Sequence, residues 1–339
     1  MNKLRIFQNK KLGVSPRHSN KTRILASRLS FSVMLLLIFF CFTLGIGYWN
    51  NNAEATSPTL LEFKQSQLKA IDWIKAHEEE VLATDNPALW WMLHDSATLS
   101  KNAYLTDLYT KYYERYLANE PSNPWHHLFD HNSQVWLQTY QYEQLPDYNQ
   151  LFLYGLSCQP TLREEPQVAK LLSVDSCDKV GTLAYLQNTT CATHQLMGVY
   201  FMQLRKCENG INTQALKISL QNQIALEATW DFRGIVDFYL QKVLMLAVTG
   251  ATDKIKPQWL KRVIHAQRPD GGWDNFYEFI KLDKDHSIGW SAKGVLWVRK
   301  PESNFHTTAQ GLYLMSILSS KAPQKNVQIA HHQIEVKTN

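Results

Sequence analysis

Gln267-Arg268-Pro269-Asp270-Gly271-Gly272-Trp273 is the stretch that says most about how this 339-residue chain folds. Pro269 cannot continue a helix, so it ends the helix that precedes it. Asp270-Gly271-Gly272 then supplies a tight turn that needs a positive φ angle, which glycine adopts without steric cost. After this turn, Trp273 can stack on the side-chain amide of Gln267. The stretch therefore predicts a tight corner at the end of a helix.

Outward from this corner, helical patterns and helix boundaries fill most of the sequence. Residues 103–117 repeat apolar or aromatic residues every three or four positions. Pro257 stands in the favoured first-turn position of the helix before the corner, and Thr307 or Thr308 is the expected cap of the last helix. No run of alternating β-branched residues is long enough to indicate a sheet. The sequence therefore predicts an all-α domain over residues 61–320, built from helical hairpins with a loose period.

The corner also carries a family resemblance. It resembles the Gln-x-x-Asp-Gly-(Ser/Gly)-Trp motif of the terpenoid cyclase and protein prenyltransferase superfamily. His306-Thr307-Thr308-Ala309, followed by an apolar helix, resembles the start of an inner helix in the same superfamily, and the likeness covers residues 257–318. The resemblance implies an α/α toroid, here an incomplete barrel of paired inner and outer helices. Polysaccharide lyases and epimerase-like proteins use similar toroids, so this fold does not name the chemistry.

A metal site is a further implication of the resemblance. Protein prenyltransferases bind zinc through an Asp-x-Cys pair and a later His. The corresponding residues here are Asp283, Asp285 and His306, so that Asp285 stands where the family has Cys. Two carboxylates and an imidazole could hold a divalent metal, although such hard ligands would differ from the family's zinc site. The alternative is that both aspartates belong to a solvated loop, and any other cofactor is unknown from the sequence.

Ionisable residues at the starts of inner helices are the candidate catalytic groups, because they would face one end of a toroid's central cavity. The candidates are His194, Asp231 and His306, with Asp237 and the neighbours His94 and Asp95 as further members. A histidine beside a carboxylate forms a general acid/base pair, since the histidine pKa lies near neutrality. The alternative is that His194, His306 and Asp231 simply cap helices.

Aromatic residues are numerous, with 11 Trp, 15 Tyr and 14 Phe. Trp and Tyr offer a flat apolar face with a polar edge, which suits sugar rings and prenyl chains equally well. Ordinary helix packing is the alternative explanation for most of them. The candidates for substrate binding lie near the ends of predicted elements and are Trp90, Trp91, Trp273 and Trp290, with Trp125 and Trp230 in similar positions.

An uncharged stretch near the N-terminus predicts a membrane anchor. Residues 31–49 read FSVMLLLIFFCFTLGIGYW and are long enough to span the hydrocarbon core as a helix. Residues 1–30 carry eight Lys or Arg and no acid, so the positive-inside rule places them in the cytoplasm and the following bulk outside. The alternative is a cleavable signal peptide, because Ala53-Glu54-Ala55 has the form of a cleavage site.

The rest of the chain divides by composition. Residues 50–60 predict a polar linker, residues 61–320 an extracytoplasmic domain, and residues 321–339 a disordered tail. Beyond residue 30 there are 27 basic residues (35 minus 8) and 30 acidic ones. No basic face of the kind that binds nucleic acid is indicated. The expected partners are a membrane and a glycan or lipid ligand.

Cysteine positions agree with export. Cys41 lies in the apolar span, whereas Cys158, Cys177, Cys191 and Cys207 form an even set within fifty residues. Such a set in an exported domain predicts two disulfides with three connectivities. The pairs Cys158–Cys177 and Cys191–Cys207 close short loops and are favoured. The alternative is two or more free thiols.

Three classes of function remain open from the sequence. One is a lyase, epimerase or hydrolase that acts on envelope glycans. A second is a prenyl- or lipid-processing protein, and a third is a non-catalytic binding or scaffold domain. A Trp- and Tyr-lined groove with a His or Asp would favour the first class, and a closed apolar cavity would favour the second.

Overall fold

The computed structural model describes residues 19–120, 122–130, 142–177, 179, 188–207, 210–231, 234–291 and 296–321. The basic tail up to residue 18 and the predicted disordered tail after Lys321 lie outside these described residues. The chain divides into two compact units, residues 1–46 and residues 47–339. Each unit is described by itself.

One long helix, α1 (Ser19–Asn52), carries the predicted anchor. Within it, Phe31–Asn52 is long and apolar enough to cross a membrane. Its large apolar side chains are exposed, including Phe39 and Phe42. Exposed side chains of this kind are expected on a helix whose surroundings are lipid. A signal sequence would have the same length and composition, so the helix alone does not decide between the two.

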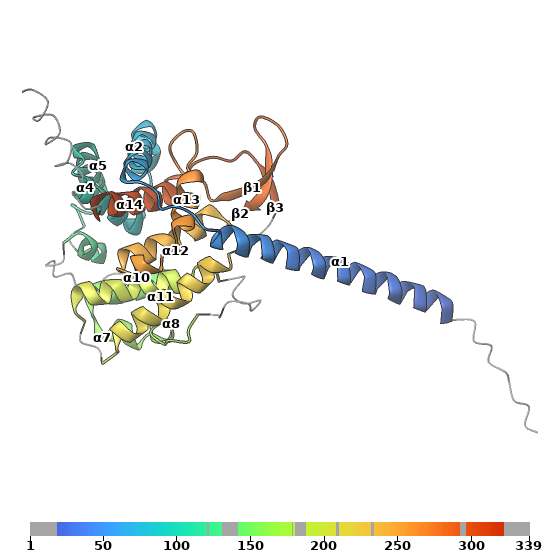
Figure 1. Cartoon of the computed structure of the whole chain (residues 1–339). Helices are drawn as coiled ribbons and strands as arrows, with labels where there is room; N and C mark the ends of the chain where they lie inside the picture. Colours follow the sequence, from blue (N-terminus) through green and yellow to red (C-terminus); the bar gives the residue numbers. More distant parts are fainter. Residues whose placement is uncertain are drawn as a thin grey trace, which may run out of the picture. The chain divides into compact units, whose positions relative to one another are not determined.

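The second unit is mostly helical, with a small sheet (Figure 1). Its α-helices are α2 (Leu60–Ala76), α3 (Glu78–Leu82), α4 (Pro87–Ser100), α5 (Ala103–Tyr116), α6 (Asp147–Ser157), α7 (Pro160–Glu164), α8 (Pro166–Leu171), α10 (Cys191–Arg205), α11 (Thr213–Thr229), α12 (Val236–Val248), α13 (Pro257–His265) and α14 (Phe305–Lys321). Its 3₁₀-helices are η1 (Pro124–Leu128), η3 (Tyr142–Gln144) and η4 (Thr252–Lys254). Its strands are β1 (Phe276–Lys281), β2 (Ser287–Ser291) and β3 (Leu296–Arg299).

Five helices pack one against the next: α4 against α14, α14 against α12, α12 against α10, and α10 against α6. The two ends of this series, α4 and α6, both contact η1. α2, α5, α8, α11 and α13 each pack on one or two members of the series. Segments far apart in sequence thus lie side by side, and α14 lies against both α2 and α4 (Figure 1).

Two neighbouring pairs of the series, α4 with α14 and α6 with α10, run in the same direction. In α4 and α14, Trp90 contacts Phe305 near the helix starts, with ring centroids 5.7 Å apart. Further along the same two helices, Tyr313 donates a hydrogen bond of 2.8 Å to Asp95. α6 and α10 are also parallel, because Tyr148 and Phe152 contact His194 near the start of α10 and Gly155 packs against Phe201 further along.

The predicted corner has the expected turn. Gly271 has a φ angle of +97°, and its carbonyl oxygen accepts a hydrogen bond of 2.8 Å from the Gln267 amide. The Trp273 indole is fully buried and donates a hydrogen bond of 2.8 Å to the Val263 carbonyl. Its ring lies against Gly311, where an added Cβ would come within 2.5 Å of the ring. Trp273 therefore fixes α13 to α14 in the core, and the prediction that it contacts substrate is wrong.

The cap of the last helix differs from the prediction. α14 begins at Phe305, and the side chain of Asn304 accepts a hydrogen bond of 3.0 Å from the Thr307 amide. The Thr308 hydroxyl instead accepts a hydrogen bond of 3.1 Å from the Trp273 amide. Asn304 is thus the cap, because both threonines already lie inside the first turn and are buried.

A three-stranded antiparallel sheet in the order β1-β2-β3 corrects the all-α prediction. β1 pairs Tyr277 with Trp290, and β2 pairs Trp290 with Leu296. The strands are four to six residues long and carry aromatic and aliphatic residues on both faces. They are too short, and hold too few β-branched residues, to form the long alternating run by which a half-buried strand is recognised in a sequence.

Both disulfides form, but with a different pairing. Cys158 is bonded to Cys207, and Cys177 is bonded to Cys191. Cys158 directly follows α6 and Cys207 closely follows α10, so the parallel packing of these helices brings the two cysteines together. The predicted pairs minimised loop length and did not take this packing into account. Cys41 is the free cysteine.

The predicted linker is shorter than expected. Residues 50–52 belong to α1, and the Asn51 side chain is fully buried in the second unit. Its amide donates a hydrogen bond of 2.8 Å to the Asp231 carbonyl, and its oxygen accepts one from Arg262. The Asn51 carbonyl accepts a hydrogen bond of 2.9 Å from the Trp259 indole. Asn51 is therefore part of the fold and not of a free connector.

Candidate functional site

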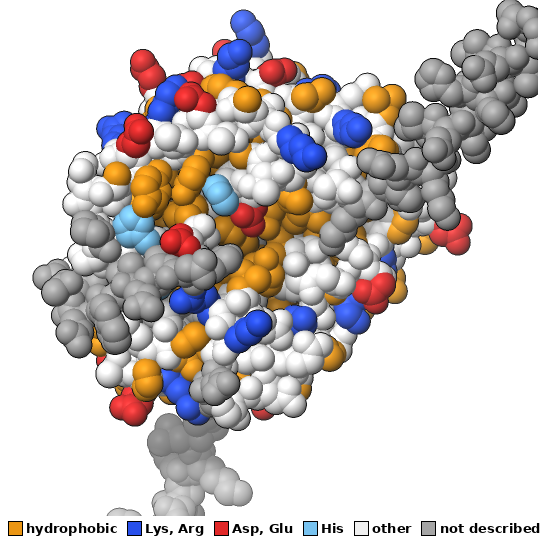
Figure 2. All heavy atoms as spheres, turned by 90° about the vertical axis from the view of Figure 1, so that its left-hand side faces the viewer, with side chains coloured by type: hydrophobic (Ala, Val, Ile, Leu, Met, Phe, Trp, Pro, Cys, Tyr) orange, Lys and Arg blue, Asp and Glu red, His pale blue; other side chains and the backbone are white. Residues whose placement is uncertain are grey.

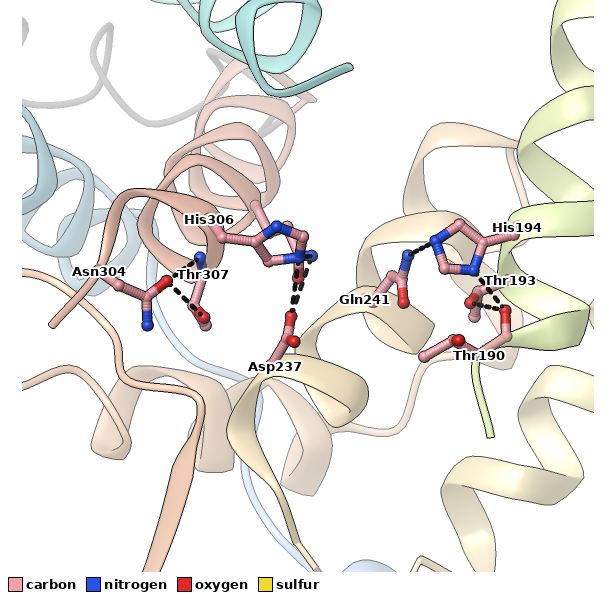
Figure 3. A network of polar contacts seen from close by, with 9 residues as sticks. Thr190, Thr193, His194, Asp237, Gln241, Asn304, His306 and Thr307 are labelled. Atoms are coloured by element: carbon pink, nitrogen blue, oxygen red, sulfur yellow. Dashed lines mark hydrogen bonds and ion pairs between the residues drawn. The ribbon is translucent and has the colours of Figure 1, made fainter. Parts of the chain in front are cut away.

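Polar side chains on three helices of the series face a common space. α14 contributes His306 and Gln310, α12 contributes Asp237 and Gln241, and α10 contributes His194. The two residues from α14 and the two from α12 are each four positions apart, a spacing that puts them on one helix face. Figure 3 shows that His306 and Asp237 point toward each other, while Gln241 points toward His194.

His306 and Asp237 form an ion pair, with His306 Nε2 at 3.3 Å from Asp237 Oδ1. The Gln310 amide donates a hydrogen bond of 3.1 Å to the same carboxylate oxygen and lies 3.0 Å from His306 Nε2. Burial opposes the charged imidazolium, but the hydrogen bond to Asp237 and the charge of Asp237 outweigh burial. The pKa of His306 therefore lies above its usual value, and this histidine tends to hold a proton.

His194 is held in the opposite state. Its Nδ1 lies 2.8 Å from the Thr190 carbonyl oxygen, which can only accept, so Nδ1 carries the hydrogen. The Gln241 amide lies 3.4 Å from Nε2 and donates to it. Tyr148 stacks on the ring at a centroid distance of 4.3 Å. Burial lowers the pKa of His194 to about 4, so the ring is neutral at pH 7 and its lone pair is on Nε2.

These two histidines suit proton transfer in both directions. Groups whose surroundings push their pKa values apart are the usual acid and base of one site. His306 is the natural proton donor, and neutral His194 can accept a proton at Nε2 where a ligand displaces the Gln241 amide from this nitrogen. His306 is also accessible, with 49% of its side chain exposed, whereas the Asp237 side chain is only 12% exposed. A ligand can therefore reach the acid, while the carboxylate beneath it stays shielded.

Aromatic side chains continue the same helix faces. Trp91 makes edge contacts with Tyr313 at 5.3 Å and with Phe201 at 5.2 Å between ring centroids. Phe201 contacts Phe152 at 5.6 Å, and Phe152 in turn contacts His194 at 6.1 Å. On one face of the molecule, hydrophobic side chains gather with histidine and acidic side chains among them (Figure 2). The polar groups therefore stand beside an aromatic wall whose rings are themselves buried in the core.

Asp95 adds a second carboxylate to this wall. It accepts a hydrogen bond of 2.8 Å from Tyr313 and lies 3.3 Å from the ring of His94. Burial and the charge of Asp95 raise the pKa of Tyr313, and burial raises the pKa of Tyr200 to about 12. Both phenols therefore remain protonated and can act as hydrogen-bond donors.

Asp231 is not part of this site, which corrects one of the predicted catalytic residues. Its Oδ2 lies 3.0 Å from the ammonium group of Lys242, which is 1% exposed, and its Oδ1 accepts from the Gly234 amide. Asp231 also begins no helix, since α12 starts at Val236. Its role is to neutralise a buried lysine, because an unpaired charge in the core would be costly.

The predicted metal site is wrong. Asp283 lies in the exposed turn after β1, where its carboxylate accepts hydrogen bonds from the backbone amides of Asp285 and His286 at 2.7 and 2.8 Å. His306 lies on α14 and pairs with Asp237. Across the described part of the chain, no three His, Cys, Asp or Glu residues are placed to hold a metal ion. The unpredicted sheet separates the aspartates from His306.

The predicted tryptophans fall in different places. Trp90 is fully buried, stacks on Tyr112 at 4.2 Å and donates to the Thr84 carbonyl, so it is a core residue and not a ligand contact. Trp290 lies on the sheet. Trp91 is also buried, at 3% exposure, and packs against Tyr313 and Phe201, so the prediction that it contacts substrate is wrong as well.

Two amide side chains of the site were not predicted. Gln241 and Gln310 are the amides that contact the two histidines. The signal that could have found them is their spacing, four residues after Asp237 and four residues after His306.

No family model, curated protein or solved structure matches this chain. The function of the site therefore has to be inferred from its own geometry.

Proposed function

We propose that this chain is a membrane-anchored, extracytoplasmic α/α-toroid protein of the terpenoid cyclase-like kind. Helices α4, α6, α10, α12 and α14 would form the inner ring, with α2, α5, α11 and α13 outside it. The continuous packing series, its contact with η1 at both ends and the parallel inner helices support this arrangement. A ring of parallel helices gathers residues from every helix at one opening, as His194, Asp237 and His306 require.

The proposed location outside the cytoplasm has two supports. Two disulfides are typical of proteins in oxidising compartments. The basic head before the apolar span favours a cytoplasmic N-terminus. Burial of Asn51 favours a retained anchor, because cleavage at Ala53–Ala55 would remove a residue that the domain core uses.

The proposed activity is acid–base chemistry on an envelope glycan, by elimination or epimerisation. The observation that carries it is the pair of histidines whose pKa values are displaced in opposite directions around one space. In an elimination, the substrate would displace the Gln241 amide from His194 Nε2, and this nitrogen would then take a proton from the carbon beside a sugar carboxylate. The adjacent carbon–oxygen bond would break as a double bond forms, and His306 would protonate the leaving oxygen.

Epimerisation would use the same first step. The proton removed by one side of the site would be replaced from the other side, and no carbon–oxygen bond would break. A sugar ring could stack on the exposed aromatic ring of Tyr148 beside His194. The substrate class is thus a glycan containing uronic acids, since the carboxylate acidifies the neighbouring C–H bond.

The test uses the full chain in detergent with uronic acid polysaccharides. Ultraviolet absorbance of the new double bond reports elimination, and deuterium uptake from heavy water reports epimerisation. We expect His194→Gln and His306→Gln each to lower kcat by about 10²–10⁴-fold, as loss of a general acid or base does. His265→Gln, on an exposed position of α13, is the matched control. Equal rates for all three variants, or no turnover of any uronate glycan by the wild type, would overturn the proposal.

A prenyl or lipid ligand is the second candidate, favoured by the hydrophobic side chains that gather around histidine and acidic side chains on one face of the molecule (Figure 2). Binding of a fluorescent prenyl alcohol that replacement of the exposed Tyr148 by alanine (Tyr148→Ala) weakens and His306→Gln leaves unchanged would favour this candidate over the glycan.

A further inference from the structure

The sheet presents a largely exposed apolar face, of which the end at Tyr277 lies against the rest of the domain. Directly paired residues of neighbouring strands point to the same side of a sheet. The register pairs Ile280 with Ile288 and Ile288 with Val298, and it pairs Trp290 with Leu296. The ring of Phe279 packs against Trp290 with centroids 5.6 Å apart. We call these six residues the apolar sheet face: Phe279, Ile280, Ile288, Trp290, Leu296 and Val298.

The other side of the sheet faces the protein over part of its width, although Trp297 on that side is 54% exposed. Phe276 and Ser287 point to that side and are buried. Arg299, which pairs with Ser287, lies over the Phe276 ring at 4.7 Å and forms an ion pair with Asp274. The sheet is therefore anchored through one side, and the apolar sheet face is the outer one.

The outer face of an antiparallel sheet is normally polar. Here Ile280, Leu296 and Val298 are 56%, 58% and 55% exposed, and no described part of the chain covers them. A contiguous exposed apolar surface of this kind marks contact with a membrane or another protein.

The neighbourhood of the sheet points to a membrane. Gly234 lies between Arg262 and Tyr277 of β1, since a Cβ there would meet the Arg262 guanidinium at 2.1 Å and the Tyr277 ring at 3.3 Å. Arg262 also donates a hydrogen bond to Asn51 at the end of α1. The sheet thus begins beside the point where the chain leaves its apolar span.

Exposed aromatic residues lie in the same part of the domain, close to the end of α1. Trp49 is 74% exposed, and Tyr48 contacts the exposed Trp230 with ring centroids 4.6 Å apart. Trp and Tyr favour the interface between hydrocarbon and water, where the ring is sheltered and the polar edge is hydrated. Such residues beside the sheet are expected if this part of the domain lies at the membrane surface.

We propose that the apolar sheet face is a membrane-contact surface, which inserts into the interfacial layer of the bilayer that holds α1. Lipid molecules of the bilayer would therefore cover the apolar sheet face. The proposal rests on the proposed membrane anchoring, and it adds a second contact between the domain and the same membrane.

The test uses nitroxide labels on the full chain in lipid nanodiscs with one copy in each disc. Cys41→Ser removes the free thiol, and single cysteines are then introduced by Val298→Cys, Phe39→Cys and Thr106→Cys. Phe39 reports the apolar span, and Thr106, on an exposed position of α5, reports water. The readout is the collision of each label with oxygen, which concentrates in lipid, relative to a water-soluble nickel chelate.

We expect the oxygen-to-nickel ratio at Val298 to approach that at Phe39 and to exceed that at Thr106. A ratio at Val298 equal to that at Thr106 overturns the membrane-contact surface. A low ratio at Phe39 shows instead that the anchoring fails, so the two failures are distinguishable. Dipolar broadening between Val298 labels in detergent that grows with protein concentration identifies a second copy as the occupant and also overturns the proposal.

Discussion

His306 Nε2 lies 3.3 Å from Asp237 Oδ1, and this pair joins the start of α14 to the start of α12. The carboxylate is shielded and the imidazole is accessible, so the charge of Asp237 acts on a group that a ligand can reach. The packing of α14 against α12 therefore determines the protonation state of His306.

Asp237→Asn is expected to lower the pKa of His306, because it removes the charge that favours the imidazolium. The wild-type pKa is raised, so the pair stabilises the fold below the unfolded value of 6.5, and this stabilisation is lost as the pH rises through the folded pKa. NMR titration of the His306 ring is the measurement. Asp95→Asn is the control, and an unchanged His306 titration in Asp237→Asn would contradict the ion pair.

His194→Gln is expected to reduce the loss of folding stability that the wild type undergoes as the pH falls into the acid range. The folded pKa of about 4 lies below the unfolded value of 6.5, so the unfolded chain binds the proton first. Stability is therefore complete above pH 6.5 and falls as the pH drops toward 4. Urea unfolding between these pH values should show a steeper loss for the wild type than for the variant. If the free energy of unfolding depended on pH in the same way in the wild type and the variant, His194 would not be buried in its neutral form.

Glu227→Gln is expected to stabilise the protein at alkaline pH. Burial raises the pKa of Glu227 to about 7 against 4.5 in the unfolded chain, so folding becomes less favourable as the pH rises from 4.5 to 7. The variant should gain roughly 1–3 kcal/mol at pH 8, since one pKa unit corresponds to about 1.4 kcal/mol. The gain should vanish near pH 4.5. Thermal unfolding beside the exposed control Glu114→Gln tests this, and an equal gain at both pH values would refute it.

Asn51→Ala is expected to lower the free energy of unfolding by about 2–3 kcal/mol, because it leaves buried polar groups without partners. The orphaned groups are the Asp231 carbonyl and the Arg262 guanidinium. Asn50→Ala is the matched control, since that side chain is exposed one position earlier on the same helix. Chemical denaturation in detergent measures both variants, and equal stabilities would mean that Asn51 contributes nothing to the domain.

Peptide mapping without reduction is expected to recover Cys158 with Cys207 and Cys177 with Cys191. Replacing the first pair by serine should cost more than replacing the second, since the bridges close 49 and 14 residues. Loop-closure entropy gives about 4 and about 3 kcal/mol. Recovery of a Cys158–Cys177 peptide would contradict the packing of α6 on α10.

Local chemistry made several features predictable from the sequence. Gly271 had to take a positive φ in the corner, and Pro257 had to open a helix, because backbone sterics fix both. His194 and His306 were identifiable as ionisable residues at the starts of periodic segments. Each of these predictions depended on a few neighbouring residues.

Predictions that depended on distant packing were less successful. Asp231 looked equivalent to Asp237, and only the position of Lys242 shows that Asp231 serves the core. The cysteine pairing depended on the direction of α6 relative to α10, which no local pattern encodes. The strands were missed because each is only four to six residues long and holds few β-branched residues, and because their pairing with one another cannot be read from any one of them.

Gln67 of α2 donates a hydrogen bond of 2.8 Å to Ser316 of α14, 249 residues later in the sequence. Synthesis proceeds from the N-terminus, so the surfaces of α2 and α4 that α14 covers must wait for nearly the entire chain. The nascent polypeptide therefore carries an unfinished core throughout elongation, a state that favours aggregation and chaperone capture. A premature stop codon ahead of Phe305 would make that state permanent, so truncated products should be degraded and should not accumulate as partly active fragments.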